Sequence, residues 1–408
     1  MNYKYIIIGN SAAAIGCIEG IRCADKLGTI GLFSSENEHT YSRPLISYLL
    51  CNKTTREKMK YRPDDFYTQN GVEAFFGKPV TKIDAHKHVV FCENNEFHYE
   101  KLLVATGSRP FIPTMLGLET VDNKFTFMSL EDAENLDKKL DKNTRVLIIG
   151  AGLIGLKCAE GIYDKVKNIT VVDMASRVLS SILNEKAAMR VQGFLENKGI
   201  KFCLSSSVSN FENSVATLTN GEKVCFDVLV IAVGVRANTE LVLNAGGAVL
   251  KGIKTDLYCQ TTLPDIYAAG DCSESFDSIA NENRVLALLP NAYMQGECAG
   301  LNMAGGEKLY DFALAMNAIG FFNLHMITAG VYTGQEIICE KEGSYRAFYI
   351  KDNHLCGYIL LGDILRAGIY TSLIRDKTPI DTVDFDLIKE NPQLIAIAGN
   401  PDSKIRGV

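Results

Sequence analysis

The clearest hydrophobic pattern in the chain lies between residues 145 and 173. Four consecutive apolar residues at 146–149 predict a strand of a parallel sheet that is buried on both faces. Glycines follow this strand directly, and residues 153–163 continue with a helical pattern. A second apolar run at 169–172 predicts the next strand. The pattern therefore predicts a strand–turn–helix–strand unit of an α/β fold.

The glycines of this turn stand at GxGxxG spacing, and each has a distinct physical task. Gly150 allows the tight turn, Gly152 lets a pyrophosphate approach the backbone, and Gly155 lets the helix pack closely on the strand. The N-terminus of the helix adds free N–H groups and a positive dipole end. Asp173 follows Gly150 by 23 positions, about where a carboxylate should meet a ribose 2′-hydroxyl. We interpret this unit as a nicotinamide dinucleotide site.

The start of the chain repeats this pattern. An apolar strand at residues 5–8 precedes Gly9, Ser11 and Ala14, which occupy the three glycine positions. Serine and alanine are small enough to permit the close approach that such a turn needs. A helix and a second strand should follow, and Glu36 comes 27 residues after Gly9 as a second ribose carboxylate. Either the chain binds two dinucleotides or one of the two units has lost its ligand.

Composition narrows the class of protein. The 408 residues are enough for two or three domains, with 47% hydrophobic and 22% charged residues. A net charge of −6 argues against general nucleic-acid binding, which needs a basic face. No apolar run approaches the roughly 18 residues of a membrane helix. The N-terminal apolar run resembles a signal peptide, but Asn10, Ser11 and two glycines interrupt it, so we expect a cytoplasmic protein.

The twelve cysteines do not predict a metal site. The closest pair, Cys17 and Cys23, is six positions apart, so the chain has no CxxC motif. An iron–sulfur cluster or zinc ion would need clustered thiolates. Most of the cysteines stand among apolar residues, where a small buried side chain in a reducing compartment is the ordinary interpretation.

Three further stretches carry a family resemblance. Residues 101–110 (KLLVATGSRP) predict a strand that enters a Thr-Gly turn, and residues 265–271 (DIYAAGD) predict a strand that ends in glycine and aspartate. Residues 230–238 (VIAVGVRAN) form a similar exit from a strand. Together with the two glycine-rich turns, this order resembles the pyridine nucleotide–disulfide oxidoreductase superfamily of flavoproteins. The resemblance runs from Lys4 to about Gly306.

The resemblance implies a fold and a domain division. The fold class is α/β, with two Rossmann-like dinucleotide-binding domains, the NAD domain being inserted in the FAD domain, and a small C-terminal α+β domain. The expected boundaries are 1–112 and 238–308 for the FAD domain, 113–237 for the NAD domain and 309–408 for the C-terminal domain. In the family the last domain covers the flavin or forms a dimer interface, so a homodimer is one expected state.

The resemblance also assigns ligands to residues. Glu36 would hold the adenosine ribose of FAD with Val80 beside the adenine, and Asp271 would bond the ribityl and phosphate region. Pro290 and Asn291 match a helix start that faces the flavin pyrimidine edge in relatives. The full set expected to bind FAD or NADH is Gly9, Ser11, Ala12, Ala13, Glu36, Arg43, Pro44, Val80, Ala105, Thr106, Gly107, Arg109, Gly150, Gly152, Leu153, Ile154, Gly155, Asp173, Gly234, Gly270, Asp271, Pro290 and Asn291.

The family divides by the route that electrons take from the flavin. Disulfide reductases carry a CxxxxC pair after the first ribose carboxylate, and NADH oxidases, peroxidases and coenzyme A-disulfide reductases carry one cysteine there. Pro44 occupies that position here, and Cys51 lies seven residues later, about two helical turns away. We interpret Cys51 as a core residue at a helix end, which leaves electron transfer through the flavin alone.

The resulting hypothesis is an FAD-dependent NADH oxidoreductase that passes electrons to an external one-electron acceptor. The segment 39–50 (HTYSRPLISYLL) resembles that of rubredoxin and ferredoxin reductases and of oxidoreductases associated with carbon monoxide dehydrogenase. This implies rubredoxin, ferredoxin or another iron–sulfur protein as acceptor. Two alternatives stay open: an NADH oxidase, peroxidase or disulfide reductase-like flavoenzyme, and a non-catalytic subunit that binds flavin or NAD.

Three finer expectations follow. Asp173 should favour NADH over NADPH by repelling a 2′-phosphate, although nearby Arg177 could accept one. Tyr48 and Lys157 replace a lysine and a glutamate that form a charge pair beside flavin N5 in ferredoxin reductases. Lys157, placed on the first turn of the NAD helix, would stabilise the anionic reduced flavin or contact the nicotinamide amide; the alternative is a lysine that faces solvent.

The last expectation concerns a docking surface. Residues 52–62 (NKTTREKMKYR) carry five basic residues and one acidic residue, directly after the helix expected along the flavin. A small acidic iron–sulfur carrier should therefore dock between Lys53 and Arg62, with an encounter rate that falls as salt screens the charges. The alternative is a solvated helix face.

Overall fold

The computed structural model describes residues 1–277, 279–393 and 396. The chain forms two compact units. The first holds Met1–Met174, Gly199–Asp277 and Glu282–Ala313. The second holds Ala175–Lys198 and the described residues from Leu314 onward, with a short stretch that ends at Asn281. The ligand-based division predicted from the sequence into FAD, NAD and C-terminal domains stays a prediction.

The first sheet of the first unit has seven strands in the order β3-β2-β1-β6-β5-β4, with β18 beside β6. Its strands β1, β2, β3, β6 and β18 run parallel, and β4–β5–β6 form an antiparallel extension. The bounds are β1 (Asn2–Ile8), β2 (Ile30–Phe33), β3 (Val72–Phe75), β4 (Val80–Asp84), β5 (Val89–Cys92), β6 (Asn95–Val104) and β18 (Ile266–Ala268).

The second sheet is parallel throughout, in the order β11-β10-β9-β15-β8. Its strands are β8 (Lys124–Phe125), β9 (Arg145–Ile149), β10 (Asn168–Val172), β11 (Lys201–Cys203) and β15 (Val228–Ile231). Three small sheets complete the unit: β12 (Val208–Glu212) with β13 (Val215–Leu218) and β14 (Lys223–Cys225); β7 (Ser108–Pro110) with β16 (Val235–Ala237); and β17 (Ile253–Lys254) with β19 (Ser273–Asp277) and β20 (Glu282–Arg284).

The helices of this unit are mostly short. They are α1 (Ala12–Ala24), α2 (Ile46–Leu50), α3 (Arg56–Met59), α4 (Phe66–Gln69), α5 (Leu130–Asp137), α6 (Leu153–Ile162), α8 (Glu240–Asn244) and α9 (Leu289–Met303), with 3₁₀ turns η1 (Arg43–Leu45), η2 (Leu118–Thr120) and η3 (Tyr163–Lys165). Alternation along β1 places Ile6 and Ile8 in one core cluster with Leu102 and Val104 of β6. A separate cluster around Leu147 and Leu229 forms the core on one face of the second sheet.

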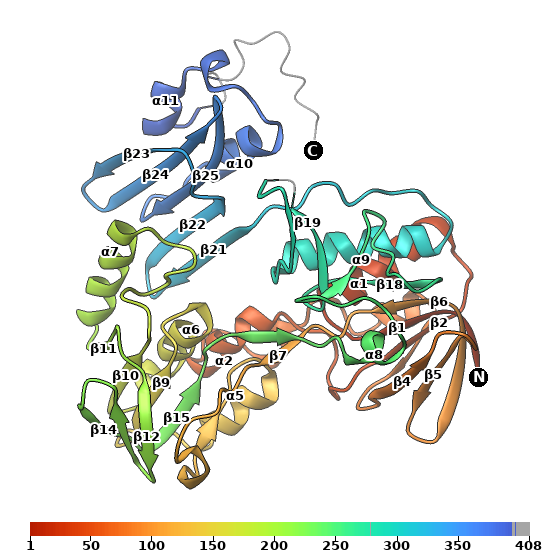
Figure 1. Ribbon diagram of the computed structural model, residues 1–408, viewed down its shortest axis with the longest axis horizontal. Helices are drawn as coiled ribbons and strands as arrows, with labels where there is room; N and C mark the ends of the chain where they lie inside the picture. The colour runs from red at the N-terminus through yellow and green to blue at the C-terminus, as the bar shows by residue number, and fades with distance from the viewer. Residues whose placement is uncertain (278, 394–395, 397–408) are drawn as a thin grey trace. The chain divides into compact units, whose positions relative to one another are not determined.

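The two long helices α1 and α9 lie side by side in parallel (Figure 1). Glycines on both helices make this possible, because a Cβ on Gly16 would lie 2.2 Å from the Tyr293 carbonyl oxygen, and one on Gly296 would lie 1.9 Å from that of Ala13. Gly20 and Gly300 repeat the arrangement further along the helices. Backbone therefore packs on backbone, and the N-termini of α1 and α9 lie at the same end.

The second unit is built around a five-stranded antiparallel sheet, in the order β21-β22-β25-β24-β23. Asn184 accepts a hydrogen bond from Ala187 N–H at the start of α7 and donates to the Tyr345 and Tyr349 hydroxyls, so this helix is tied to the sheet. Its elements are α7 (Glu185–Glu196), β21 (Met316–Phe321), β22 (Leu324–Gly330), β23 (Gln335–Lys341), β24 (Ser344–Lys351), β25 (His354–Leu361), α10 (Ala367–Arg375), η4 (Ile380–Thr382) and α11 (Phe385–Glu390).

The predicted fold class is confirmed: two Rossmann-like parallel sheets are accompanied by a C-terminal antiparallel sheet with helices. None of the helices in the described part of the chain combines the length and apolar composition needed to cross a bilayer.

The α1–α9 contact generates a stability prediction. Gly296→Ala should cost about 3 kcal/mol, because the added Cβ meets a carbonyl of rigid backbone, and should lower Tm by about 6–12 °C. Gly193→Ala in α7 is the matched control, since its Cβ meets nothing within 4 Å. It should raise helix stability by about 0.5–1 kcal/mol. Calorimetry of both variants measures the contrast, and equal Tm values would contradict the backbone packing.

Candidate functional site

The glycine turn between β9 and α6 forms an open cradle. Gly150 has φ of 111°, and a Cβ there would lie 2.2 Å from the Ala232 carbonyl oxygen. A Cβ on Gly155 would lie 2.0 Å from the Gly150 carbonyl oxygen, so helix and turn are in contact. Around Gly152, the N-cap of α6, a Cβ would meet nothing within 4 Å, and no side chain caps the helix. Free N–H groups therefore face open space that an anionic phosphate fits.

Asp173 stands directly after β10, where the sequence predicts the ribose carboxylate. Its carboxylate accepts a hydrogen bond of 2.6 Å from the Ala151 N–H inside the glycine turn. The backbone of Asp173 is held between Cys203 and Ser206. The Asp173 carboxylate is therefore fixed beside this glycine turn.

The first glycine turn has the same construction between β1 and α1. Gly9 has φ of 119°, and its Cβ would lie 2.0 Å from the Ala105 carbonyl oxygen. Ser11 is the N-cap of α1 and makes no capping bond with its side chain. Ala12 and Ala13 form the buried first turn. The amide ends of this helix are thus also available to an anionic group.

Glu36 lies beyond β2 in a charged cluster. It forms an ion pair with Arg43 and accepts a 2.8 Å hydrogen bond from the Tyr41 hydroxyl. Tyr41 in turn accepts a hydrogen bond from the Leu130 N–H at the start of α5. Burial by itself would lower the pKa of Arg43, but the neighbouring Tyr41 and Glu36 outweigh it and raise that pKa. The guanidinium is therefore firmly charged, and the adjacent Pro44 is exposed.

The segments that follow β6 and β15, which the sequence analysis singles out, pair with each other. β7 and β16 form an antiparallel ribbon. Thr106 Oγ1 donates to the Asn238 carbonyl at 2.7 Å, and Asn238 Nδ2 donates to the Thr106 carbonyl at 2.9 Å. Arg109 binds Asn238 and Glu240 on the exposed side. The first sheet thus leads into the second, and the chain returns from it, through a single hydrogen-bonded ribbon.

A third set of candidate residues gathers around the start of α9. The Asp271 carboxylate accepts a hydrogen bond of 3.0 Å from Ser108, and burial raises its pKa although Ser108 and Arg43 act against the rise. Gln295 of α9 accepts a hydrogen bond from the Gly270 N–H at 2.7 Å, which fixes the Gly-Asp turn against the helix.

Asn291 at this helix start is 2% exposed, and its buried Nδ2 has no hydrogen-bond partner. An orphaned buried amide is costly unless a ligand or water completes it. Pro290, one residue earlier, is exposed. The side chain and the helix end therefore fit an acceptor-rich ligand such as a flavin edge.

The Tyr48 ring and the Lys157 ammonium are in contact, and their expected place beside flavin N5 stays a prediction. The Lys157 ammonium lies 4.4 Å from the centroid of the Tyr48 ring, and it forms an ion pair with Glu160. The Lys157 side chain is only 17% exposed, so the solvent-facing alternative is wrong. Lys157 is also the fifth residue of α6, in its second turn rather than its first.

Glu160 is the residue that sequence reasoning missed. Its side chain is 3% exposed, and Lys53 lies 3.6 Å from it in addition to Lys157. The available signal was an acidic residue in an otherwise apolar helix, three positions after a lysine. Local spacing indicates that pair, but only the fold brings in Lys53 and Tyr48.

The structure shows where Cys51, the cysteine nearest to Pro44 in the sequence, lies. Cys51 is the C-cap of α2, and its Sγ lies 3.6 Å from the Tyr48 carbonyl oxygen. It is half-buried rather than a core residue, which corrects that part of the interpretation. Burial raises the pKa of the Cys158 thiol on α6, which favours its protonated form. Within the described residues, no cluster of three His, Cys, Asp or Glu side chains could hold a metal ion.

Four of the five cations in the basic segment, residues 52–62, form ion pairs. Arg56 pairs with Glu134 and Glu38, Lys60 with Glu57 and Asp64, Arg62 with Glu19, and Lys53 with Glu160. Lys58 is exposed and has no ion pair among the described residues. The count of charges along the sequence therefore overestimates the positive potential of this segment, because most of the carboxylates that pair with it come from elsewhere in the chain.

Two candidate residues stand apart from these contacts. Val80, at the start of β4, packs against the core of the first sheet. Gly234 has φ of 118° and an open surrounding, between β15 and β16.

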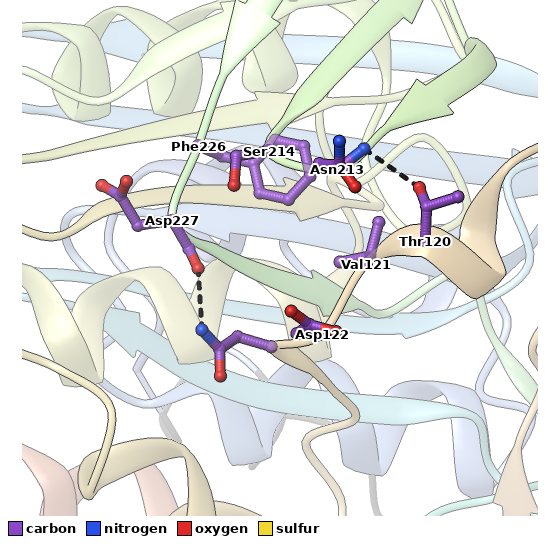
Figure 2. Close-up of a pocket in the computed structure, with 8 residues that line it drawn as sticks. Thr120, Val121, Asp122, Asn213, Ser214, Phe226 and Asp227 are labelled. Atoms are coloured by element: carbon purple, nitrogen blue, oxygen red, sulfur yellow. Dashed lines mark hydrogen bonds between the residues drawn. The ribbon is translucent and has the colours of Figure 1, made fainter.

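A small polar pocket of about 70 Å³ is lined by Thr120, Asn213, Asp227 and their neighbours (Figure 2). None of the predicted cofactor residues lines it.

Comparison with known proteins identifies the family. The sequence profile of a family described as pyridine nucleotide-disulphide oxidoreductase matches residues 3–296 of this chain. The NADH-dependent phenylglyoxylate dehydrogenase subunit epsilon of Aromatoleum evansii is 30% identical over 392 residues, which are 92% of this chain and 92% of that protein. The nitric oxide reductase FlRd-NAD(+) reductase of Enterobacter sp. (strain 638) is 32% identical over 279 residues, covering 67% and 73% of the two chains.

Among solved structures, the covalent putidaredoxin reductase–putidaredoxin complex has the same fold. Its matched chain superposes with a TM-score of 0.89 at 23% identity and covers 98% of both chains. The sequence match over most of the chain, with the two glycine cradles in place, shows that this chain belongs to the pyridine nucleotide-disulphide oxidoreductase family and is an NAD(P)H-dependent flavin oxidoreductase.

Proposed function

We propose that this protein is an FAD-dependent NADH reductase that passes electrons to a small iron–sulfur carrier, with rubredoxin as the favoured acceptor. The observation that carries the proposal is the pair of glycine turns in one unit, each leading into a helix without a side-chain cap, with no cysteine in the segment between Glu36 and Leu50. When bound, FAD supplies the redox chemistry of accepting two electrons and releasing them singly. The chain supplies binding, orientation and electrostatics.

The residues present fit the two cofactors. For FAD, the free end of α1, the Glu36 carboxylate and the orphaned amide of Asn291 offer complementary groups to phosphate, ribose and flavin. For NADH, the open space at Gly152 and the fixed carboxylate of Asp173 do the same. The neighbouring turn residues Ala105, Thr106, Gly107, Gly270 and Asp271 would shape the space between them.

The acceptor is inferred from what the segment after Glu36 lacks. Pro44 stands where thiol-dependent relatives carry their cysteine, and Cys51 is held at the far end of α2. Electrons must then leave without a thiol relay, which favours a one-electron carrier over a disulfide. The names of two relatives support this direction, since one is an FlRd-NAD(+) reductase and the other a subunit of an NADH-dependent dehydrogenase.

The decisive experiment is anaerobic reduction followed by an acceptor panel. NADH should bleach the bound flavin, and turnover should be fastest with rubredoxin, then ferredoxin, and slow with oxygen, peroxide and disulfides. NADPH should have a lower kcat/KM, because the Asp173 carboxylate repels a 2′-phosphate. Faster turnover with oxygen or peroxide would establish the oxidase alternative. Failure of NADH to bleach the flavin would establish a non-catalytic subunit.

The glycine cradle of α6 gives a sharper test of the NADH site. Gly152→Val should leave Tm unchanged, because its Cβ meets nothing within 4 Å. It should raise the KM for NADH at least about tenfold, equivalent to about 1.4 kcal/mol, by filling the space over the helix end. Gly155→Ala is the matched control and should lower Tm, since its Cβ meets the Gly150 carbonyl. An unchanged KM in Gly152→Val would remove this turn from the NADH site.

Docking of the acidic carrier near the segment between Lys53 and Arg62 is part of the proposal. The ion pairs within the segment leave Lys58 as its best single probe. Reversing Lys53 would also disturb Glu160, and reversing Lys60 would break two ion pairs. Lys58→Glu changes the charge alone.

Lys58→Glu should lower the acceptor's association rate about fourfold at low salt. Two charge units at about 10 Å in water correspond to about 0.8 kcal/mol. The difference should vanish at high salt, and reduction of the flavin by NADH should be normal. Lys26→Glu is the control, because Lys26 is also exposed but lies beyond the C-terminal end of α1. Equal association rates for both variants would place docking elsewhere.

A further inference from the structure

A partly buried charged cluster lies where α2 meets α6. It consists of Lys53, Glu160 and Lys157, with the Tyr48 ring as its floor. Glu160 is 3% exposed, whereas Lys157 is 17% and Lys53 51% exposed. The Tyr48 ring lies 4.4 Å from one ammonium and 5.7 Å from the other. Two cations therefore share one aromatic ring and one carboxylate.

The helix packing fixes this arrangement closely. A Cβ on Gly161 would lie 2.8 Å from the Ser47 carbonyl oxygen, so α6 and α2 touch through backbone one residue after Glu160 and one before Tyr48. Lys157 and Glu160 stand three positions apart on one face of α6. Since the backbones cannot move closer or slide past this contact without strain, the Tyr48 ring has a defined distance from the ion pair.

Stability alone is a poor reason for such a cluster. Desolvation of a buried carboxylate costs several kcal/mol, and replacement of buried ion pairs by well-packed apolar residues is often neutral or stabilising. The other buried residues of α6 are apolar or small, among them Leu156, Ala159 and Gly161. A purely structural junction could therefore be built without charge.

The position of the cluster indicates its purpose. α6 begins at the open cradle around Gly152, and α2 follows directly on Arg43, which pairs with Glu36 of the first fold. The cluster thus belongs to both nucleotide folds, at the place where their helices meet. Two cofactors that exchange a hydride must also meet between the folds that bind them.

We propose that Glu160 is a positioning residue that holds the Lys157 ammonium on the Tyr48 ring, so that one fixed cation faces the junction of the two folds. This inference rests on the proposed NADH-to-flavin reaction. A fixed cation there stabilises negative charge that moves toward the flavin side, and it needs no reorganisation during the reaction. Lys53, which is half exposed, balances the carboxylate from the solvent side.

The first test measures where the ammonium lies, independently of activity. Lysines are dimethylated with ¹³C-formaldehyde, and the Lys157 methyl signal, assigned by its loss in Lys157→Gln, should be shifted upfield by the Tyr48 ring current. Glu160→Gln should abolish that shift, as should Tyr48→Leu. Asp137→Asn is the matched control, because it removes the carboxylate of the Lys165–Asp137 pair just beyond α6. An unchanged Lys157 signal in Glu160→Gln would overturn the proposal.

The second test measures the consequence by stopped-flow reduction with NADH. Glu160→Gln and Lys157→Gln should each slow flavin reduction at least about tenfold, with the KM for NADH within twofold of wild type. The double variant should be no slower than either single variant, because both remove the same positioned charge. Additive losses, or normal rates in Glu160→Gln, would overturn the proposal.

The two experiments separate this inference from the proposed function. If the wild-type flavin is not reduced by NADH, the proposed function fails, and the ring-current shift still reports on Glu160. If Glu160→Gln does not fold, Tyr48→Leu tests the same geometry, since it leaves Glu160 paired with Lys53 and Lys157. Normal reduction in Tyr48→Leu together with an unchanged Lys157 signal would then overturn the proposal.

Discussion

The close contact between α1 and α9 is the constraint on which the first nucleotide fold depends. Gly16, Gly20, Gly296 and Gly300 let the two helix backbones approach until any Cβ would collide with a carbonyl. Because the helices are parallel and held in this register, their N-termini lie at the same end. The contact therefore aligns two helix dipoles and places the N-termini of both helices at the same end of the fold. Side chains of ordinary size would separate the helices and move one N-terminus away from the other.

Close backbone contacts at glycines also shape the second nucleotide fold. Gly150 touches the Ala232 carbonyl, Gly155 touches the turn itself, and Gly161 touches α2. Of the four glycines between Gly150 and Gly161, Gly152 is the one that faces open space. Glycine therefore serves two opposite purposes within one turn and its helix: at three positions it permits protein contact, and at one it leaves open space. Spacing alone does not separate these purposes, whereas the surroundings of each Cβ do.

Electrostatics connects the folds. Arg43 pairs with Glu36, Asp271 is buried beside Ser108, and Lys157 with Glu160 lies against Tyr48. Each of these groups is partly desolvated, so its charge acts over longer distances than a surface charge would. By contrast, the cations of the basic segment are mostly paired at the surface, where ion pairs contribute little and are screened by salt. The buried charges, rather than the conspicuous basic run, give the site its electrostatic character.

The sequence by itself determined the elements and the turns. The apolar runs predicted β1, β9 and β10, and the glycine spacing predicted both glycine turns, because these signals depend on hydrogen bonding and burial within a few residues. Asp173 was predictable for the same reason, since it stands at a strand end beside its own glycine turn.

The tertiary structure alone decided how charges are compensated. Glu160 finds Lys53 more than a hundred residues earlier, and Arg56 finds Glu134 nearly eighty residues later. The isolation of Asn291 depends on the helix packing around it. A charge is paired or unpaired according to which side chains lie within about 4 Å, and distance along the chain says nothing about that separation. The elements of the fold could therefore be predicted from the sequence, whereas the pairing of charges at its site could not.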